Sequence, residues 1–144
     1  MTTIDQQLNA TPASGYAGDI SPQAAYDAWI SGAAILVDIR TSAEREWVGF
    51  VPGAPAVVWK QWPGMTMNPD FDAQIQALVA QSGGKPVVML CRSGIRSIAS
   101  AKRATELGLT AYNILEGFEG DPDGVAHRSS RGGWRYRGLP WRQN

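Results

Sequence analysis

The chain has 144 residues, with 13 basic and 13 acidic side chains and a formal net charge of zero. This length is typical of a single domain that can bury a substantial core. The balanced charge excludes a general attraction to nucleic acid or to an anionic membrane surface. A single cysteine excludes an intrachain disulfide framework and favours a reducing compartment with a free, reactive thiol.

The N-terminal segment lacks the basic and apolar stretches of a secretion signal. No apolar run approaches the ~20 residues that a membrane helix needs. We therefore expect a cytoplasmic protein with no membrane partner. Residues 1–17 are polar, which predicts a flexible lead-in to one domain that spans residues 18–144.

The first half of the domain carries clear start signals for helices. Ser21 followed by Pro22 is typical of a helix N-terminus. The apolar run 33–40 ends in charged residues and predicts a strand buried on both faces. Thr41 and Glu44 have the spacing of a capping box, so a second helix is expected directly after this strand.

Strands and helices continue to alternate along the rest of the domain. A short strand is expected near residues 57–59, and apolar spacing over residues 68–84 predicts a helix that ends at a glycine pair. Residues 85–91 read as a second buried strand, 97–108 as a helix, and 111–118 as a final strand. This alternation predicts βαβ units and a parallel sheet.

The only cysteine lies where a buried strand gives way to a short basic loop. Ligands of parallel sheets bind at the carboxyl ends of the strands. Cys91 is at one such end, and Asp38 and Arg40 are at another. A lone cysteine is usually only a small buried hydrophobe. The strand–loop–helix setting, two nearby arginines and a glycine favour a nucleophile here.

Three features of the loop favour the thiolate, which is the reactive form of cysteine. Backbone N–H groups of the loop can converge on an anion, and the next helix directs the positive end of its dipole at the loop. Arg92 and Arg96 add two charges, and Gly94 allows a tight curl. The candidate anion cradle consists of Arg92, Ser93, Gly94, Ile95, Arg96 and Ser97.

The loop sequence CRSGIRS resembles the active-site loop of the rhodanese family of sulfurtransferases. The segment LVDIRTSAEREWVGFVPGA resembles the family's first signature, and ILEGF and GWRYRGLPW resemble its closing segments. The resemblance extends from about residue 20 to residue 141. Phe50 stands where the family usually has a histidine, and Phe118 replaces a glycine. Residues 118–133 are longer than the family's usual spacing, and they carry the lone His127, which we expect to be solvated.

The resemblance implies a three-layer α/β/α fold with a five-stranded parallel sheet and the Cys91 strand near its middle. It implies that Cys91 takes a sulfane sulfur from an anionic donor, with thiosulfate favoured over 3-mercaptopyruvate, and holds it as a persulfide. Cyanide, a cellular thiol or a protein such as a thioredoxin-like acceptor then removes the sulfur. Arg92 and Arg96 would hold the donor, and no metal or organic cofactor is implied.

Several interpretations remain open at this point. Asp38 and Arg40 are expected to form a structural ion pair beneath the loop rather than to bind substrate. The domain could act as a persulfide carrier or docking module for a partner protein. It could also be a cysteine-based phosphatase or arsenate reductase, but those enzymes space Cys and Arg one residue farther apart than the four residues between Cys91 and Arg96. The Gly- and Arg-rich segment 118–144 is expected to pack back on the domain through its tryptophans.

Overall fold

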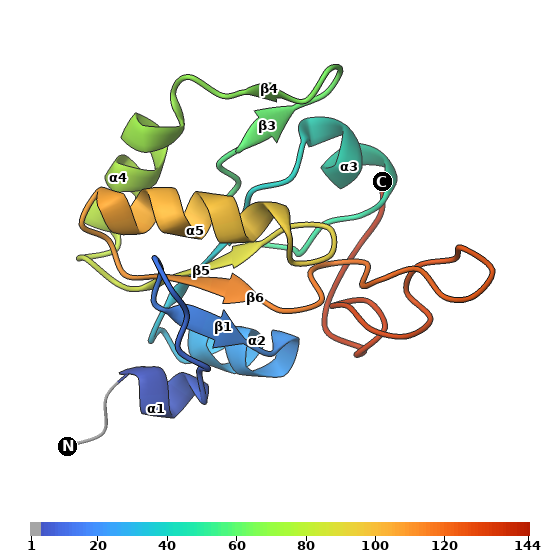
Figure 1. Cartoon of the computed structure of the whole chain (residues 1–144), viewed down its shortest axis with the longest axis horizontal. Helices are drawn as coiled ribbons and strands as arrows, with labels where there is room; N and C mark the ends of the chain where they lie inside the picture. The colour runs from blue at the N-terminus through green and yellow to red at the C-terminus, as the bar shows by residue number, and fades with distance from the viewer. Residues whose placement is uncertain (1–3) are drawn as a thin grey trace.

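The computed structural model describes residues 4–144 and shows a parallel sheet between two layers of helices (Figure 1). Within these residues the main sheet has four strands, and the strand that leads to Cys91 lies between two others. In spatial order the strands are β1 (Gly18–Ile20), β6 (Ala111–Ile114), β5 (Val87–Leu90) and β2 (Ile35–Asp38). Each neighbouring pair is parallel, so the predicted sheet type is confirmed.

The sheet has one strand fewer than the resemblance implies. The segment 57–59, expected to be a strand, does run beside the end of β2, because Val57 N donates to Asp38 O at 3.0 Å. Only Ala56 forms a bridge pair with Asp38. Pro55, just before it, has no N–H to extend the ladder in one direction. In the other direction, Arg40 N donates to Asp38 Oδ1 at 3.0 Å rather than to Val57 O, so the pairing is too short to make a fifth strand.

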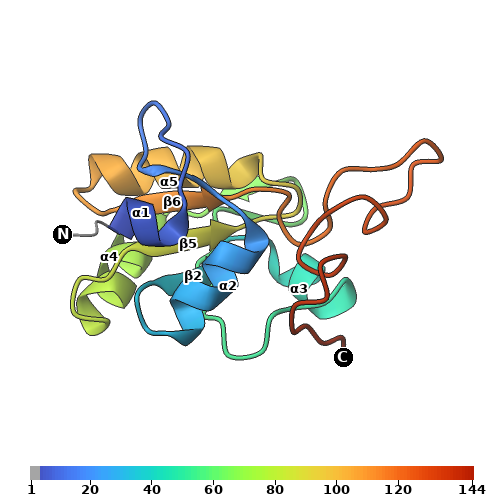
Figure 2. The same cartoon turned by 90° about the horizontal axis from the view of Figure 1, so that it is seen from below.

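Helices cover both faces of the sheet, which confirms the three-layer arrangement. The buried residues of α4 and α5 pack on one face, and those of α1 and α2 pack on the other (Figure 2). The helices are α1 (Ile4–Leu8), α2 (Pro22–Ile30), α3 (Ser42–Trp47), α4 (Phe71–Gln81) and α5 (Arg96–Glu106). None of them is both long and apolar enough to cross a membrane.

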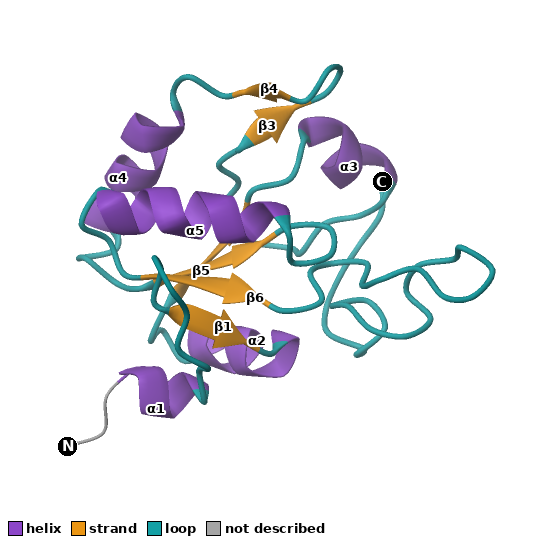
Figure 3. Ribbon diagram, in the orientation of Figure 1, coloured by secondary structure: helices purple, strands orange, loops and turns teal. Residues whose placement is uncertain are grey.

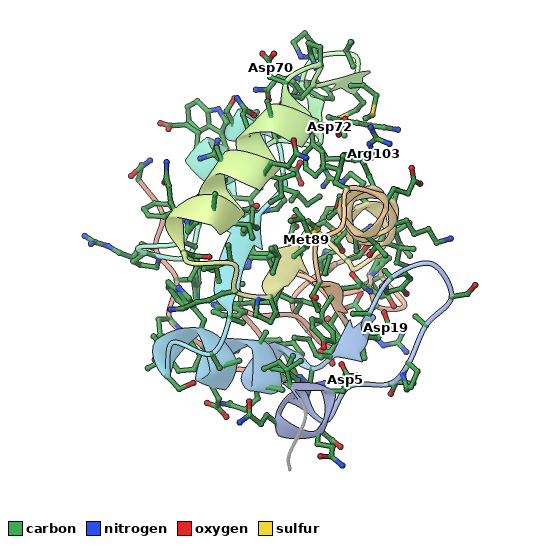
Figure 4. All side chains as sticks on the ribbon, turned by 90° about the vertical axis from the view of Figure 1, so that its left-hand side faces the viewer. Asp5, Asp19, Asp70, Asp72, Met89 and Arg103 are labelled. Atoms are coloured by element: carbon green, nitrogen blue, oxygen red, sulfur yellow. The ribbon has the colours of Figure 1, made fainter. Side chains whose placement is uncertain are left out.

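Alternation along the strands decides which side chains meet which helices, because successive residues point to opposite faces. Met89 and Cys91 belong to the cluster under α4 and α5, whereas Val88 and Leu90 belong to the cluster on the α2 side. The thiol therefore lies on the α5 side of the sheet. On the same side, Arg103 Nε of α5 donates to Asp72 Oδ1 of α4 at 2.9 Å; both side chains are labelled in Figure 4.

The helix starts follow the sequence signals. The Ser21 side chain accepts a hydrogen bond from the backbone N–H of Ala24 at 3.1 Å. The Thr41 side chain accepts from Glu44 N at 3.1 Å, and the Glu44 carboxylate accepts from Thr41 N at 3.2 Å. The predicted capping box is thus confirmed, and it places Glu44 in the first turn of α3.

The N-terminal segment, described from residue 4, contains regular structure where a flexible lead-in over residues 1–17 was expected; residues 1–3 lie outside the described residues. From residue 4 it forms α1, whose Leu8 is buried in the core with Ile4 packed beside it. Spacing of four residues puts both side chains on one face of this short helix. Thr11 then exchanges two backbone hydrogen bonds with Asp19 of β1, each 2.9 Å long.

The C-terminal segment packs back on the domain, as its tryptophans predict. It contains no helix or regular strand, yet Trp134 is buried and its Nε1 donates to Pro140 O at 2.8 Å. The Trp134 ring also packs edge-on against Tyr26 of α2, with 5.9 Å between ring centroids. In Figure 1 this segment gathers beside α3, beyond the ends of the strand arrows.

Candidate active site

Cys91 directly follows β5 and is 1% exposed. The next residues curl back over it before α5 begins at Arg96 (Figure 3). Gly94 N donates to the Cys91 Sγ at 3.1 Å, and Ser97 Oγ lies 3.1 Å from the same sulfur. Gly94 has a φ of +93°, which glycine adopts without strain. The predicted strand–loop–helix setting is present, with the thiol at the start of the helix.

The turn after β6 braces the cysteine loop through its backbone. Phe118 N donates to Cys91 O at 2.8 Å, and Glu119 N donates to Arg92 O at 2.9 Å. A Cβ atom at Gly117 would lie 2.5 Å from Cys91 O, so only glycine allows this approach. The position of the thiol therefore depends on the ILEGF segment as well as on its own loop.

A pocket of about 670 Å³ opens over Cys91. Its wall comes from the Cys91 loop, from α3 and from the hairpin formed by β3 (Lys60–Gln61) and β4 (Thr66–Met67). Besides the loop, the lining residues are Thr41, Ala43, Glu44, Val48, Trp62, Met65 and Glu119. The hairpin was not predicted from the sequence, and its turn adds Trp62 and Met65 to the apolar lining of the pocket.

Arg96 does not present a free charge to the pocket, contrary to its expected role in anion steering. Its Nη1 and Nη2 donate to the two Glu44 carboxylate oxygens at 2.8 and 2.6 Å, and each side chain is 19% exposed. Burial raises the pKa of Glu44, but the hydrogen bonds and charge of Arg96, together with bonds from Thr41, hold that pKa below its usual value. Glu44 is thus a site residue that the helix-cap interpretation alone overlooks.

Arg92 is the pocket arginine that remains available. Its side chain is exposed, and among residues 4–144 it makes no ion pair. Glu119 stands on the same pocket wall. The two arginines and the two glutamates of the pocket therefore balance in formal charge, and within the described residues Arg92 is the pocket arginine without an ion pair.

Asp38 and Arg40 form the expected ion pair, and it is fully buried. Arg40 Nε and Nη2 donate to the Asp38 carboxylate at 3.0 and 2.7 Å, and Nη2 also donates to Gly49 O at 2.8 Å. The guanidinium stacks on the Phe118 ring, 4.2 Å from its centroid. Neither residue lines the Cys91 pocket. Phe118, a departure from the family pattern, thus covers a buried cation.

Phe50 and His127, which the sequence analysis also singled out, do not line the Cys91 pocket. Phe50 exchanges backbone hydrogen bonds with Arg142, each 2.9 Å long, and so holds the end of the chain against the domain. His127 is exposed, and its backbone N–H donates to the Asp123 carboxylate at 3.0 Å. Within residues 4–144, no group of three or more His, Cys, Asp or Glu side chains is arranged to hold a metal ion.

Comparison with known proteins identifies related chains. Residues 21–120 match the rhodanese-like domain. A crystal structure of Rv0390 from M. tuberculosis is 41% identical, covers 90% of this chain and 99% of its own, and superposes with a TM-score of 0.79. An uncharacterized protein of Rickettsia conorii is 35% identical over 121 residues, which is 81% of this chain and 90% of that protein. The polysulfide-sulfur transferase homodimer of Wolinella succinogenes is 25% identical, with a TM-score of 0.51 over 88% of this chain and 78% of its own.

Proposed function

The chain belongs to the rhodanese-like domain family, and on that premise we propose that it is a sulfurtransferase that carries a sulfane sulfur on Cys91. The observation that carries the proposal is the buried Cys91 Sγ at the floor of a pocket, with Gly94 N donating to it at 3.1 Å. A related fold belongs to a polysulfide-sulfur transferase, which supports the same class of chemistry.

In the first step, the Cys91 thiolate attacks the outer sulfur of the donor. With thiosulfate as donor, a bond forms between Sγ and this outer sulfur. The bond between the two thiosulfate sulfur atoms breaks, and sulfite leaves with the bonding electron pair. The product is an anionic Cys91 persulfide. The Gly94 N–H, which donates to Sγ at 3.1 Å, and the N-terminus of α5 favour negative charge here.

In the second step, a nucleophilic acceptor attacks the outer persulfide sulfur. Cyanide would leave as thiocyanate, and a thiolate would leave as a new persulfide. The electron pair of the broken sulfur–sulfur bond returns to Cys91 as a thiolate. This sequence is covalent catalysis of the ping-pong type, in which donor and acceptor use the same pocket in turn.

The pocket suits an anionic donor and a larger acceptor. Arg92 is free to pair with a donor such as thiosulfate, whereas Arg96 is held by Glu44. A volume of about 670 Å³ falls in the range of sites for organic ligands, roughly 300–1,000 Å³. Trp62 and Ile95 are 62% and 69% exposed at this pocket. A thiol with an apolar neighbourhood, including a cysteine of a partner protein, would therefore fit better than cyanide.

The alternative of a persulfide carrier uses the same chemistry and differs only in the acceptor. The phosphatase or arsenate reductase alternative is disfavoured by the Arg96–Glu44 pair, because an oxyanion would have to displace Glu44 before it could bind this arginine.

Initial rates of thiocyanate formation, measured while thiosulfate and cyanide are both varied, test the proposal. Parallel double-reciprocal lines for the wild type and no activity for Cys91→Ser are expected; equal activity of Cys91→Ser would refute it.

A further inference from the structure

A chain of hydrogen bonds runs from the thiol to the edge of the sheet. Ser97 Oγ lies 3.1 Å from Cys91 Sγ and donates to Asn113 Oδ1. Asn113 Nδ2 donates to Asp19 Oδ1 at 2.9 Å, and the Tyr16 hydroxyl donates to the same oxygen at 2.9 Å. Cys91, Ser97 and Asn113 are buried, whereas Asp19 and Tyr16 are half-buried.

The fold brings these residues together from distant parts of the sequence. Asp19 of β1 and Asn113 of β6 are register neighbours on the parallel pair. Ser97 is in the first turn of α5, which packs on this face of the sheet. Figure 4 labels Asp19 at the edge of the sheet, on the strand below α5. The hydrogen bonds that link Ser97, Asn113 and Asp19 join side chains, so they are separate from the backbone hydrogen bonds of α5 and of the sheet.

The direction of each hydrogen bond follows from what the groups can donate. An ionised carboxylate only accepts, so Asn113 must turn its NH₂ group toward Asp19. The Asn113 carbonyl oxygen then faces Ser97, and the one hydroxyl proton of Ser97 must point at it. Ser97 can therefore offer only a lone pair to Cys91. A neutral thiol can donate its proton to that lone pair, whereas a thiolate would be repelled by it.

We propose that Asp19 and Asn113 are positioning residues that hold the Ser97 hydroxyl as an acceptor and so favour the neutral Cys91 thiol in the sulfur-free enzyme. For Ser97 to donate to a thiolate, it must leave Asn113 with a buried, unpaired carbonyl oxygen. In the persulfide, Sγ carries no proton and the charge lies on the outer sulfur. The acceptor role of Ser97 therefore destabilises the free thiolate and does not destabilise the persulfide.

The hydrogen-bonded chain Cys91–Ser97–Asn113–Asp19–Tyr16 is called the relay, and the charged groups on the segments packed against Cys91 lie outside it. They are Asp38 at the end of β2, Arg40 just after it, Glu44 on α3, Arg92 and Arg96 beside the thiol, and Glu119 after β6. At the far end of the relay, burial, the hydrogen bond to Asp19 and the Asp19 charge raise the pKa of Tyr16 to about 12. Tyr16 therefore stays a donor throughout the pH range of the test.

The test measures the rate of Cys91 alkylation by iodoacetamide against pH, followed by intact mass. Asp19→Asn lets Asn113 turn its amide and donate to Ser97, which frees the hydroxyl proton for the thiolate. The expected result is a profile displaced by about one pH unit to lower pH, equivalent to about tenfold faster alkylation on its acid side. Loss of the negative charge of Asp19 would by itself also move the profile to lower pH. The effect of Asp19→Asn must therefore also be measured in a second background, a variant that lacks the Ser97 hydroxyl.

Ser97→Ala supplies that background. The relay predicts that Asp19→Asn has less than a threefold effect once Ser97 is gone. An equal displacement in both backgrounds, or none in the wild-type background, would overturn the proposal. Asn113→Ala tests the relay again while keeping the Asp19 charge, and it should displace the profile in the same way. Thermal unfolding shows whether Asn113→Ala folds; if it does not, Asp19→Asn alone decides.

The inference rests on the proposed function only in taking Cys91 as the nucleophile. Alkylation requires no sulfur donor or acceptor, so its outcome does not depend on sulfur transfer. Normal thiocyanate formation with unchanged alkylation profiles in the variants would overturn the relay and leave the function standing. Displaced alkylation profiles without any thiocyanate formation would support the relay and overturn the proposed function.

Discussion

Replacing Arg96 by methionine is expected to destabilise the protein by about 2 kcal/mol. The substitution removes two charge-assisted hydrogen bonds, of 2.8 and 2.6 Å, to a carboxylate that is 19% exposed. Breaking a fully buried pair costs about 3–5 kcal/mol and breaking an exposed pair ~0–1, so an intermediate value fits these partners. For a chain of this length, the corresponding fall in Tm is about 6–8 °C.

Urea unfolding of a double-mutant cycle measures the pair itself. Glu44→Gln is the matched partner, because its amide oxygen can still accept from Thr41 in the capping box. The account predicts a coupling energy of about 1–2 kcal/mol between the two positions. Strictly additive effects would show that the two side chains do not stabilise each other and would refute the reasoning.

The same cycle has a predicted pH dependence. The pKa of Glu44 is lower in the folded protein than in the unfolded chain, so the contribution of the pair is complete above the ordinary glutamate range. That contribution is lost as pH falls through the lowered folded pKa. The stability difference between wild type and Arg96→Met should therefore be constant near neutral pH and shrink below about pH 4–5. A difference that stays constant down to pH 3 would contradict this assignment.

Three further substitutions test other parts of the site. Cys91→Ser should abolish thiocyanate formation with a Tm close to that of the wild type, and residual turnover would remove the nucleophile assignment. Gly117→Ala, whose Cβ would meet the Cys91 backbone at 2.5 Å, should lower both Tm and sulfur transfer; its control is Gly108→Ala, which has a similar positive φ but open space around it and should cost only about 1–2 kcal/mol without loss of transfer. Trp62→Ala should raise KM for a bulky organic thiol several-fold and leave KM for cyanide unchanged; equal effects on both acceptors would show that the hairpin does not contact the acceptor.

Local sequence signals predict the part of the site that depends on neighbouring residues. The apolar run before Cys91 and the small and basic residues after it predict a strand end and an anion cradle. The Thr41 and Glu44 spacing predicts the start of α3 correctly. These features depend on contacts between residues only a few positions apart, so a short stretch of sequence is enough to predict them.

The parts that the sequence leaves open depend on distant partners. Arg96 binds Glu44, which is 52 positions away in the sequence, and no local pattern near either residue indicates that contact. Asn113 and Asp19 are 94 positions apart. Asn113 does give one signal, because it is a polar residue in an otherwise apolar strand, and a buried polar side chain needs a partner. The fifth strand is absent for a local reason: its apolar residues suit a strand, but Pro55 has no N–H to extend the ladder on one side, and on the other side the Arg40 N–H donates to the Asp38 side chain.

The central claim is that Cys91 carries sulfur, and the most direct measurement is the intact mass of the protein after incubation with thiosulfate. The account predicts a gain of one sulfur atom in the wild type, none in Cys91→Ser, and complete loss of the added mass on treatment with cyanide. Absence of any gain with thiosulfate, 3-mercaptopyruvate and polysulfide would contradict the claim.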